Sequence, residues 1–284
     1  MRHLAKLVLK LLLTLLLGGL LAATLVRFAP GFGTDEAQLD IRLNNQSIDA
    51  LQQRPNENIA GFYFHYCQRL LHGDLGRSRT LERPVSELIR ERMPETLKSV
   101  GLGLLLGWAL GLSLASLAVM ARSASLDWIA GIFCGTLLCI PVAVLAILFI
   151  IAQAPERLVL AAAVFPQIYH YARNLLMRSM NQPHVLTAWA KGIGGLRLLC
   201  WHVLRPAAPQ LLAVAGVSAS LAFTTAIPVE ALCDLPGLGQ LAWKAAMGRD
   251  LYLLVTLTVL VTAVTLIANS SCELLGNVLG VRRA

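Results

Sequence analysis

The sequence predicts an all-α polytopic membrane protein with six transmembrane helices. Of its 284 residues, 56% are hydrophobic and 14% are charged, whereas a soluble domain carries roughly 25% charged residues. The mean hydropathy is +0.65. The hydrophobic residues gather in stretches of about 20, the length at which a helix crosses a bilayer. This composition excludes an ordinary soluble enzyme, and it excludes disorder, which needs low hydrophobicity and high charge.

The first transmembrane helix is predicted at residues 7–28, behind the basic residues Arg2, Lys6 and Lys10. A basic start followed by a leucine-rich stretch is also typical of a signal peptide. We favour a retained helix, because the apolar stretch is longer than the roughly 7–15 residues of a signal sequence and no clear A-x-A cleavage site follows it.

Residues 29–95 form a polar segment with eight arginines and ten acidic residues, which is predicted to lie outside the membrane. Within it, residues 59–71 place apolar side chains at helical spacing. This pattern predicts a short amphipathic helix at the membrane interface. A second short helix is expected at residues 85–92, and Pro94 is expected to end it.

Five further spans follow, at residues 96–120, 128–152, 158–177, 207–227 and 251–275, with a loop expected at 228–250. The first carries small residues on one helix face, which permit close approach of another helix. The second should bend at a proline. The third is polar enough to face protein or a cavity rather than lipid. The small residues of the first span are Gly103, Gly107, Gly111 and Ala115, the proline of the second is Pro141, and the polar residues of the third include His170 and Arg173.

The distribution of charge predicts the orientation. Lysine and arginine near helix ends prefer the cytoplasmic side. The stretch between residues 157 and 229 contains basic residues and no acidic residue. We therefore expect residues 178–206 and both termini in the cytoplasm and residues 29–95 outside. The net charge of +8 is then an orientation signal and not a nucleic-acid patch.

Residues 184–206 predict two short helices, at 186–191 and 196–204, joined by a glycine turn. Gly192, Gly194 and Gly195 permit a chain reversal that other residues resist. Pro206 is suited to the start of the next helix. A short helix that projects from a membrane is well formed for docking into a groove of another protein.

This loop resembles the EAA loop of bacterial ABC-importer permeases, and in particular of the peptide/nickel group of dipeptide and oligopeptide B-type subunits. The matching residues are Thr187–Ala188–Trp189–Ala190–Lys191–Gly192 and His202–Val203–Leu204–Arg205. Three other segments resemble motifs of the same group: Gly73–Asp74–Leu75–Gly76–Arg77–Ser78, Arg92–Met93–Pro94–Glu95–Thr96–Leu97, and Glu230 with Pro236–Gly237–Leu238–Gly239 and Arg249–Asp250.

The chain also departs from that group in three places. Trp189 stands where the group usually has arginine. The external connection at residues 153–157 is shorter than usual, and Gly280–Val281–Arg282–Arg283 replaces the C-terminal D-P-R. These departures concern the docking partner and the substrate rather than the fold.

The resemblance implies the fold of type I ABC importer permeases. It divides the chain into an N-terminal helix (1–28), an external segment (29–95) and a five-helix core (96–284) with the EAA-like loop at 184–206. It implies half of a translocation pathway in the inner membrane, beside a homologous permease, two cytosolic ATPases and an external solute-binding protein. A peptide is the expected substrate, and nickel or a metal chelate is the alternative. The chain itself would hold no cofactor and catalyse nothing, since ATP and Mg would bind to the ATPase subunits.

The EAA-like loop is expected to couple the permease to the ATPases, although its charge alone would suit a merely solvated basic loop. The candidate coupling residues are Thr187, Ala188, Lys191, Gly192, Leu204 and Arg205.

A second group of residues is expected at an external gate or along the substrate path. The Pro236–Gly239 segment is equally consistent with a purely structural turn. The threonines are equally consistent with hydrogen bonds between helices. The candidates are Glu230, Pro236, Gly237, Gly239, Arg249, Asp250, Thr224 and Thr225.

The histidine, cysteine and serine residues of the sequence form no recognisable catalytic or metal-binding motif. The sequence has no metal-binding motif of the H-E-x-x-H type and no paired catalytic residues. A disulfide between Cys67 and Cys233, both on the expected outer side, stays open. Two other classes also remain, an ion-driven secondary transporter and a non-transporting scaffold, but we find none of the inverted repeats typical of the first.

Overall fold

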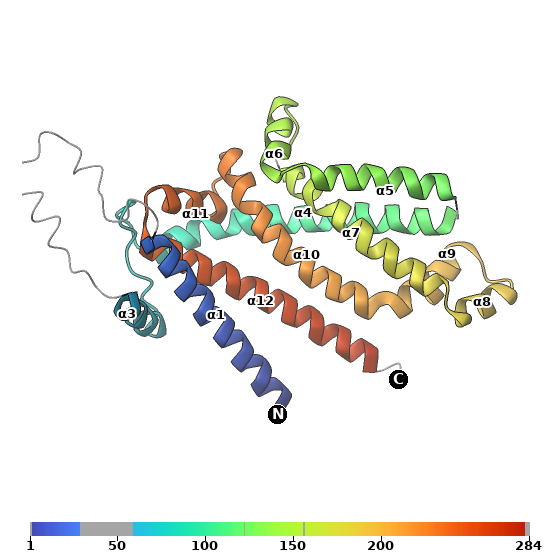
Figure 1. Ribbon diagram of the computed structural model, residues 1–284, viewed down its shortest axis with the longest axis horizontal. Coiled ribbons are helices and arrows are strands. Elements are labelled where there is room, and N and C mark those ends of the chain that lie inside the picture. The colour runs from blue at the N-terminus through green and yellow to red at the C-terminus, as the bar shows by residue number, and fades with distance from the viewer. Residues whose placement is uncertain (1, 29–58, 122, 156, 282–284) are drawn as a thin grey trace, which may run out of the picture. The chain divides into compact units, whose positions relative to one another are not determined.

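The computed structural model describes residues 2–28, 59–121, 123–155 and 157–281. Within these ranges the chain is helical and contains no strand, only an isolated bridge between Arg77 and Pro84. Figure 1 shows the elements in order: α1 (Arg2–Phe28), α3 (Ile59–Leu71), α4 (Val85–Ala121), α5 (Ala124–Cys139), α6 (Val142–Ile151), α7 (Arg157–Met180), α8 (Pro183–Ala190), α9 (Gly195–Leu198), the π-helix η2 (Leu199–Leu204), α10 (Arg205–Leu232), α11 (Leu238–Met247) and α12 (Leu251–Val281).

Three helices in the described part are long and apolar enough to cross a membrane: Val85–Ala121, Gly195–Leu232 and Leu251–Gly276. The pair α5 and α6 makes a fourth span if it is counted as one, although its two helices differ in direction by 98°. The apolar part of α1, Leu11–Leu25, is shorter. The prediction of an all-helical, multi-pass membrane protein is confirmed, and the number of six spans stays a prediction.

The chain divides into two compact units, residues 1–91 with 244–262, and residues 92–243 with 263–284. In the first unit α3 packs on α1. The hydroxyl of Tyr63 donates to the carbonyl of Leu16 at 2.7 Å, and a Cβ on Gly19 would lie 2.5 Å from that hydroxyl. Ala23, Tyr66, Val255 and Val259 form the buried cluster of this unit. The helix predicted at residues 59–71 is therefore confirmed.

In the second unit the small-residue face of α4 packs closely on α7. A Cβ on Gly103 would lie 2.7 Å from the Cβ of Leu160, and one on Gly111 would lie 2.9 Å from the Ile168 side chain. Ala115 on the same face is fully buried. The spacing of four residues thus correctly predicted a helix contact, because residues four apart share one face.

The prediction that Pro94 ends a short helix is wrong, because α4 continues from Val85 to Ala121 with Pro94 inside it. Proline removes the bond to the carbonyl four residues earlier, here that of Arg90. Both Pro94 and Arg90 are exposed, so this carbonyl can be solvated, while Thr96 and Ser99 are buried and keep the next turn in place.

The loop expected at residues 228–250 is also wrong. Helix α10 continues through Pro228 to Leu232, where Val229 and Glu230 are buried, and α11 occupies Leu238–Met247. The helix predicted at 196–204 is not separate, since Gly195–Leu232 forms one continuous helical segment. The bend expected at Pro141 is confirmed as a complete break between α5 and α6.

Candidate functional site

Glu230 lies near the C-terminal end of α10 with an exposed fraction of 0%. Its Oε2 accepts hydrogen bonds from the hydroxyl of Thr96 on α4 at 3.1 Å and from the backbone N–H of Gly239 at 2.7 Å. The Thr96 hydroxyl in turn accepts from the backbone N–H of Leu238 at 2.7 Å. One carboxylate therefore joins α4, α10 and the start of α11.

The two glycines of the Pro236–Gly239 turn lie against the Glu230 side chain and the backbone of α10. A Cβ on Gly237 would lie 2.1 Å from Oε2 of Glu230, and a Cβ on Gly239 would lie 2.7 Å from the Cα of Ile227. Atoms cannot approach this closely, so neither position has room for a side chain. Pro236 is exposed. The structural interpretation of the turn is thus supported by its contacts.

Oε1 of Glu230 has no hydrogen-bond partner among the described residues. A buried carboxylate oxygen without a donor is unfavourable, because it has lost its hydrogen bonds to water. The two hydrogen bonds to Oε2 keep the side chain in this position despite that loss. A neighbouring network includes Gln240, whose Oε1 accepts from Arg92 at 3.0 Å and whose amide donates to Asp234. Gln240 was not among the candidates predicted from the sequence, although it directly follows the glycine turn.

Asp250 organises the first unit in a similar way, with an exposed fraction of 1%. Its Oδ2 accepts from the hydroxyl of Ser78 at 2.6 Å and from the backbone N–H groups of Arg79 and Thr80 at 2.6 and 3.1 Å. Its Oδ1 accepts from the N–H of Leu253 at 3.1 Å, which satisfies a free donor at the start of α12. Asp250 thus connects two motifs that lie far apart in the sequence.

The Gly73–Ser78 turn is shaped to meet this carboxylate. Gly73 and Gly76 have φ angles of +76° and +75°, a conformation that glycine adopts without strain. Oδ1 of Asp74 accepts from the N–H of Gly76 at 2.9 Å. Arg249 has φ of +50° and is exposed, so the structure gives Arg249 and its neighbour Asp250 different environments.

The polar residues of α10 mostly bond to other helices or to their own. Ser218 accepts from the indole N–H of Trp108 at 3.0 Å, and Ser220 accepts from the amide of Asn269 at 3.0 Å. The hydroxyl of Thr224 donates to the carbonyl of Ser220 at 3.0 Å, and Thr225 is half-buried. Ser218 and Ser220 therefore bond between helices, whereas Thr224 is exposed and bonds within α10, so its place on a substrate path stays a prediction.

Arg173 on α7, one of the polar residues expected to face protein or a cavity rather than lipid, forms an ion pair with Asp127 near the start of α5. The Nε and Nη2 atoms of Arg173 donate to the Oδ1 and Oδ2 atoms of Asp127, respectively. A bidentate pair of this kind has a fixed geometry. The pair joins two helices, which accounts for a charged residue at this depth without a substrate.

The EAA-like loop is built from α8, a glycine turn, α9 and η2. Gly192 and Gly195 have φ angles of +78° and +60°, so the turn needs glycine at both positions. His184 Nε2 lies 2.9 Å from the carbonyl oxygen of His202, and Ser179 donates to the carbonyl of Val203 at 3.0 Å. These contacts hold α8 and α7 against η2.

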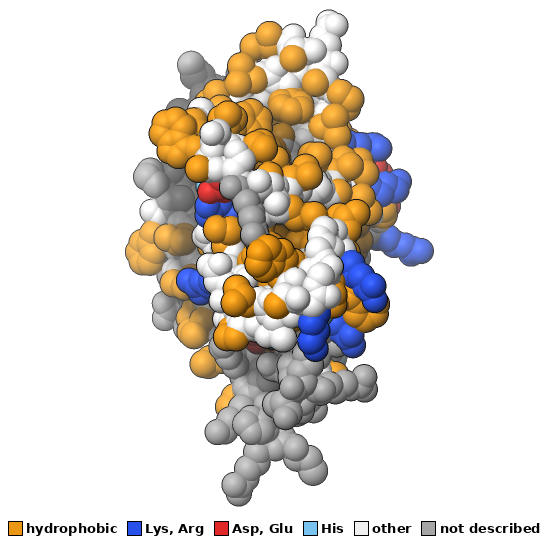
Figure 2. Space-filling model, turned by 90° about the vertical axis from the view of Figure 1, so that its right-hand side faces the viewer, with side chains coloured by type: hydrophobic (Ala, Val, Ile, Leu, Met, Phe, Trp, Pro, Cys, Tyr) orange, Lys and Arg blue, Asp and Glu red, His pale blue; other side chains and the backbone are white. Residues whose placement is uncertain are grey.

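The loop exposes large hydrophobic side chains beside basic ones. Figure 2 looks onto the end of the unit that carries α8 and α9, where hydrophobic and basic side chains share the surface. Exposed apolar groups that lie together mark an interaction surface. We call the set Leu186, Trp189, Leu196 and Trp201 the loop patch; its members are 59% to 71% exposed.

The predicted coupling residues divide between this surface and the core beneath it. Lys191 and Arg205 are exposed, and the guanidinium of Arg205 lies 5.2 Å from the ring centre of Trp201. Ala188 is buried, Leu204 is half-buried, and the hydroxyl of Thr187 donates to the carbonyl of Pro183 at 3.0 Å.

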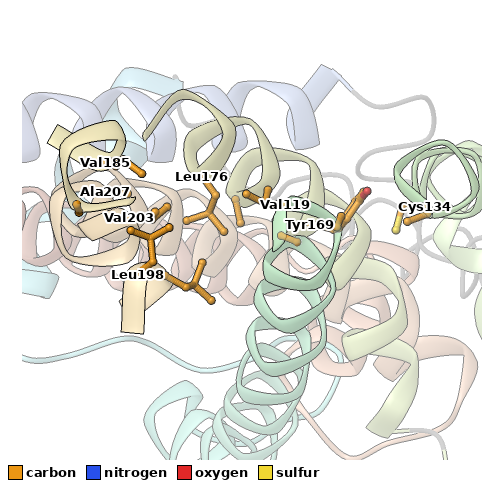
Figure 3. Close-up of a cluster of buried hydrophobic side chains, with 14 residues drawn as sticks. Val119, Cys134, Tyr169, Leu176, Val185, Leu198, Val203 and Ala207 are labelled. Atoms are coloured by element: carbon orange, nitrogen blue, oxygen red, sulfur yellow. The ribbon is translucent and has the colours of Figure 1, made fainter. Parts of the chain in front are cut away.

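The core beneath the loop is continuous with the membrane helices. Figure 3 shows this cluster, in which side chains from the loop lie against side chains from four long helices. A cavity of 130 Å³ beside it is lined by Trp189, Gly194 and Gly195 together with residues of α4, α7, α9 and η2. The labelled members of the cluster are Val119 (α4), Cys134 (α5), Tyr169 and Leu176 (α7), Val185 (α8), Leu198 (α9), Val203 (η2) and Ala207 (α10).

Metal and disulfide sites are absent from the part of the chain that the structure describes. It contains no group of three or more His, Cys, Asp or Glu side chains placed to hold a metal ion. It also contains no disulfide. Cys67 and Cys233 lie in different units, so their pairing stays open.

Comparison with known proteins identifies relatives along most of the chain. Residues 103–282 match the family described as binding-protein-dependent transport system inner membrane component. The oligopeptide transport system permease protein OppB of Salmonella typhimurium is 27% identical over 229 residues, which covers 73% of this chain and 75% of that protein. OppB of Haemophilus influenzae is 26% identical over 274 residues, which covers 88% and 89%.

A solved structure of the MetNI methionine ABC transporter in inward facing conformations shares the fold. The TM-score is 0.60 over 68% of this chain and 96% of the matched chain, at 17% sequence identity. At this identity the likeness concerns the fold alone.

Proposed function

The chain belongs to the family of binding-protein-dependent transport system inner membrane components, and on that premise we propose that it forms one half of the pathway for peptides through an ATP-driven importer. It is a multi-pass permease subunit and not itself an enzyme. The match over residues 103–282 carries this conclusion. Peptide is the proposed substrate because the relatives over most of the chain are oligopeptide permeases.

The proposed assembly contains a second, homologous permease, two cytosolic ATPase subunits that bind ATP and Mg, and an external solute-binding protein. We assign six spans to the chain, in α1, α4, α5, α7, α10 and α12. The positive-inside rule supports cytoplasmic termini and a cytoplasmic EAA-like loop, with residues 29–95 on the side of the binding protein.

The loop patch is the proposed contact with an ATPase subunit. The loop exposes this hydrophobic surface together with the basic side chains of Lys191, Arg197 and Arg205, which suits a groove on a protein partner. Hot spots of binding energy are enriched in tryptophan and arginine, and the loop patch contains two tryptophans. Closure of the ATPases would then act on α8 and α9.

Movement of the loop would reach the membrane helices by two connections. First, Gly195–Leu232 is one continuous helical segment, so α9 and α10 share a backbone without a loop between them. Second, Val185, Leu198 and Val203 are buried in the same cluster as Tyr169 and Leu176 of α7. Packed cores resist continuous deformation, so the loop and the bundle would move together between inward-open and outward-open states.

The test compares two exposed tryptophans in the assembled complex. Trp189→Ala removes a member of the loop patch, and Trp128→Ala removes an exposed tryptophan of α5. We expect Trp189→Ala to lower the amount of copurified ATPase and the ATP-driven uptake of peptide into proteoliposomes roughly tenfold, as loss of an interface hot spot would. Trp128→Ala should change neither. Equal effects of the two substitutions would contradict the assignment of the loop patch.

A further inference from the structure

Helix α6 leaves the direction of α5 at an angle of 98°, as Figure 1 shows. The break lies at Ile140 and Pro141, whose backbones are extended with ψ of 121° and 138°. Proline cannot donate the hydrogen bond that would continue α5. The two helices are therefore separate elements, and α6 does not extend α5 across a membrane.

Both faces of α6 are apolar. One face, which includes Leu145 and Ala146, is buried, and α6 contacts α7 and α10. The other carries Val144, Ile147, Leu148 and Ile151, which are 45% to 73% exposed. We call these four residues the outer stripe; their spacing of three, four and seven positions places them on one side of a helix. Val142–Ile151 contains no charged or polar residue.

The direction of α6 follows from the helices to which it is attached. α5 packs on α7, which in turn packs on the spanning helix α10. The 16 residues of α5 extend about 24 Å at 1.5 Å per residue, most of the roughly 30 Å of a hydrocarbon core. A helix at a right angle to α5 at its far end then runs along the membrane and not through it.

We propose that α6 is an in-plane membrane helix whose outer stripe inserts into the acyl chains of the outer leaflet. A helix that is apolar on all sides belongs in the membrane or in a protein core, and α6 is too short to cross. Its placement in the outer leaflet rests on the proposed orientation of the chain.

The composition of the outer stripe favours lipid over a second subunit. Contacts between membrane helices are enriched in small residues, and in polar residues that bond across the interface. The outer stripe has neither, since each of its side chains is valine, leucine or isoleucine. The face of α4 that contacts α7 shows the contrast, because it carries Gly103, Gly107 and Gly111. Acyl chains, which need no bonding partner, suit the outer stripe better.

The experiment measures the depth of three positions of the outer stripe. A fluorescent coumarin residue replaces Val144, Ile147 or Ile151, one at a time, in the full chain reconstituted with the subunits that copurify with it. Phosphatidylcholines brominated at different acyl carbons quench from within the bilayer, and iodide quenches from water. We expect strong lipid quenching, weak iodide quenching and the same depth within a few ångströms at all three positions.

Two positions on α5 provide the matched control. Ile129 and Leu138 are exposed apolar residues nine positions apart, so a crossing α5 should place them about 13 Å apart in depth. A steady change of about 10 Å between positions 144 and 151 would instead mean that α6 crosses, and would overturn the proposal. Strong iodide quenching, or quenching by neither agent because a subunit covers the outer stripe, would overturn it too.

The measurement is independent of transport. Each labelled complex must elute like the unlabelled one, and Leu148 serves as a substitute position if one label prevents assembly. Peptide uptake is measured separately in the unlabelled complex. A wrong depth pattern with intact uptake would refute the placement of α6 alone, whereas absent uptake with the expected depth pattern would refute the proposed function alone.

Discussion

The hydroxyl of Ser78 donates a 2.6 Å hydrogen bond to Oδ2 of Asp250, which follows it by 172 positions in the chain. The same oxygen accepts two backbone N–H groups from the residues after Ser78. Two motifs that lie far apart in the sequence therefore form one contact. In the second unit Thr96 and Glu230 are related in the same way, at 3.1 Å and a separation of 134 positions. In both cases a buried carboxylate is the acceptor.

Asp250→Asn should destabilise the protein, because an amide cannot accept at every position where the carboxylate does. Loss of charge-assisted bonds to a buried group costs about 2–3 kcal/mol, which thermal unfolding in detergent would detect as a lower Tm. Asp74→Asn is the control, since Asp74 is exposed and accepts one bond, from Gly76. The hypothesis fails if both variants lose the same stability.

Glu230→Gln should preserve stability to within about 1 kcal/mol, whereas Glu230→Ala should lower it by about 2–4 kcal/mol. Glutamine keeps one oxygen to accept from Thr96 and Gly239, and it removes the charge at the oxygen that lacks a partner. Alanine removes the acceptor and leaves a cavity. Chemical unfolding of the three proteins separates these outcomes; a glutamine variant as unstable as the alanine variant would show that the charge itself is needed.

Gly237→Ala should lower stability by about 1–3 kcal/mol, the usual effect of overpacking, since its Cβ would lie 2.1 Å from Oε2 of Glu230. Gly131→Ala on α5 is the matched control, because nothing lies within 4 Å of its Cβ. That substitution should be neutral or stabilising, since alanine favours a helix over glycine.

The same pair of positions allows a double-mutant cycle. If Gly237→Ala destabilises through the carboxylate, its effect should shrink when Glu230 is already alanine, because residues in contact do not contribute additively. Thermal unfolding of the two single variants and the double variant measures this difference. Strict additivity would mean that Gly237 is required for another reason.

Gly192→Pro should uncouple ATP hydrolysis from the peptide. Gly192 has φ of +78°, whereas proline requires φ near −65°, so the turn between α8 and α9 must change shape. Peptide-stimulated hydrolysis by the assembled complex should fall several-fold while basal hydrolysis remains. Gly194→Ala is the control, with an extended φ of −133° and open space around its Cβ. Unchanged stimulation in the proline variant would remove the coupling role of this turn.

Much of the fold follows from local pattern. The apolar stretches predicted the helices, and the spacing of Gly103, Gly107 and Gly111 predicted a closely packed face. The helix continues through Pro94 and Pro228, where the rules for proline predicted an end, because Thr96 and Glu230, each two positions later, are buried and hold the next turn in place. At Pro141 no such support exists, since Ile140 and Pro141 are not buried, and the helix breaks.

The candidate site shows the same division. The sequence contains its motifs in the expected order, and Gly192 and Gly195 predicted the turn. The hydrogen-bond partners of the motif residues could not be predicted, because a sequence does not say which donor will contact a buried carboxylate more than a hundred positions away. Arg173 was expected to face protein or a cavity, and only the structure shows that its partner is Asp127.

The sequence by itself determined the class of protein, its helices and its family, because hydrophobic content, period and motif order are local properties of the chain. Only the tertiary structure decided that Asp250 accepts a hydrogen bond from Ser78, that Glu230 holds the glycine turn against α4, and that α6 turns away from α5. Each of these depends on atoms brought together by packing, where steric exclusion and the need to satisfy buried polar groups choose among arrangements that the chain alone allows.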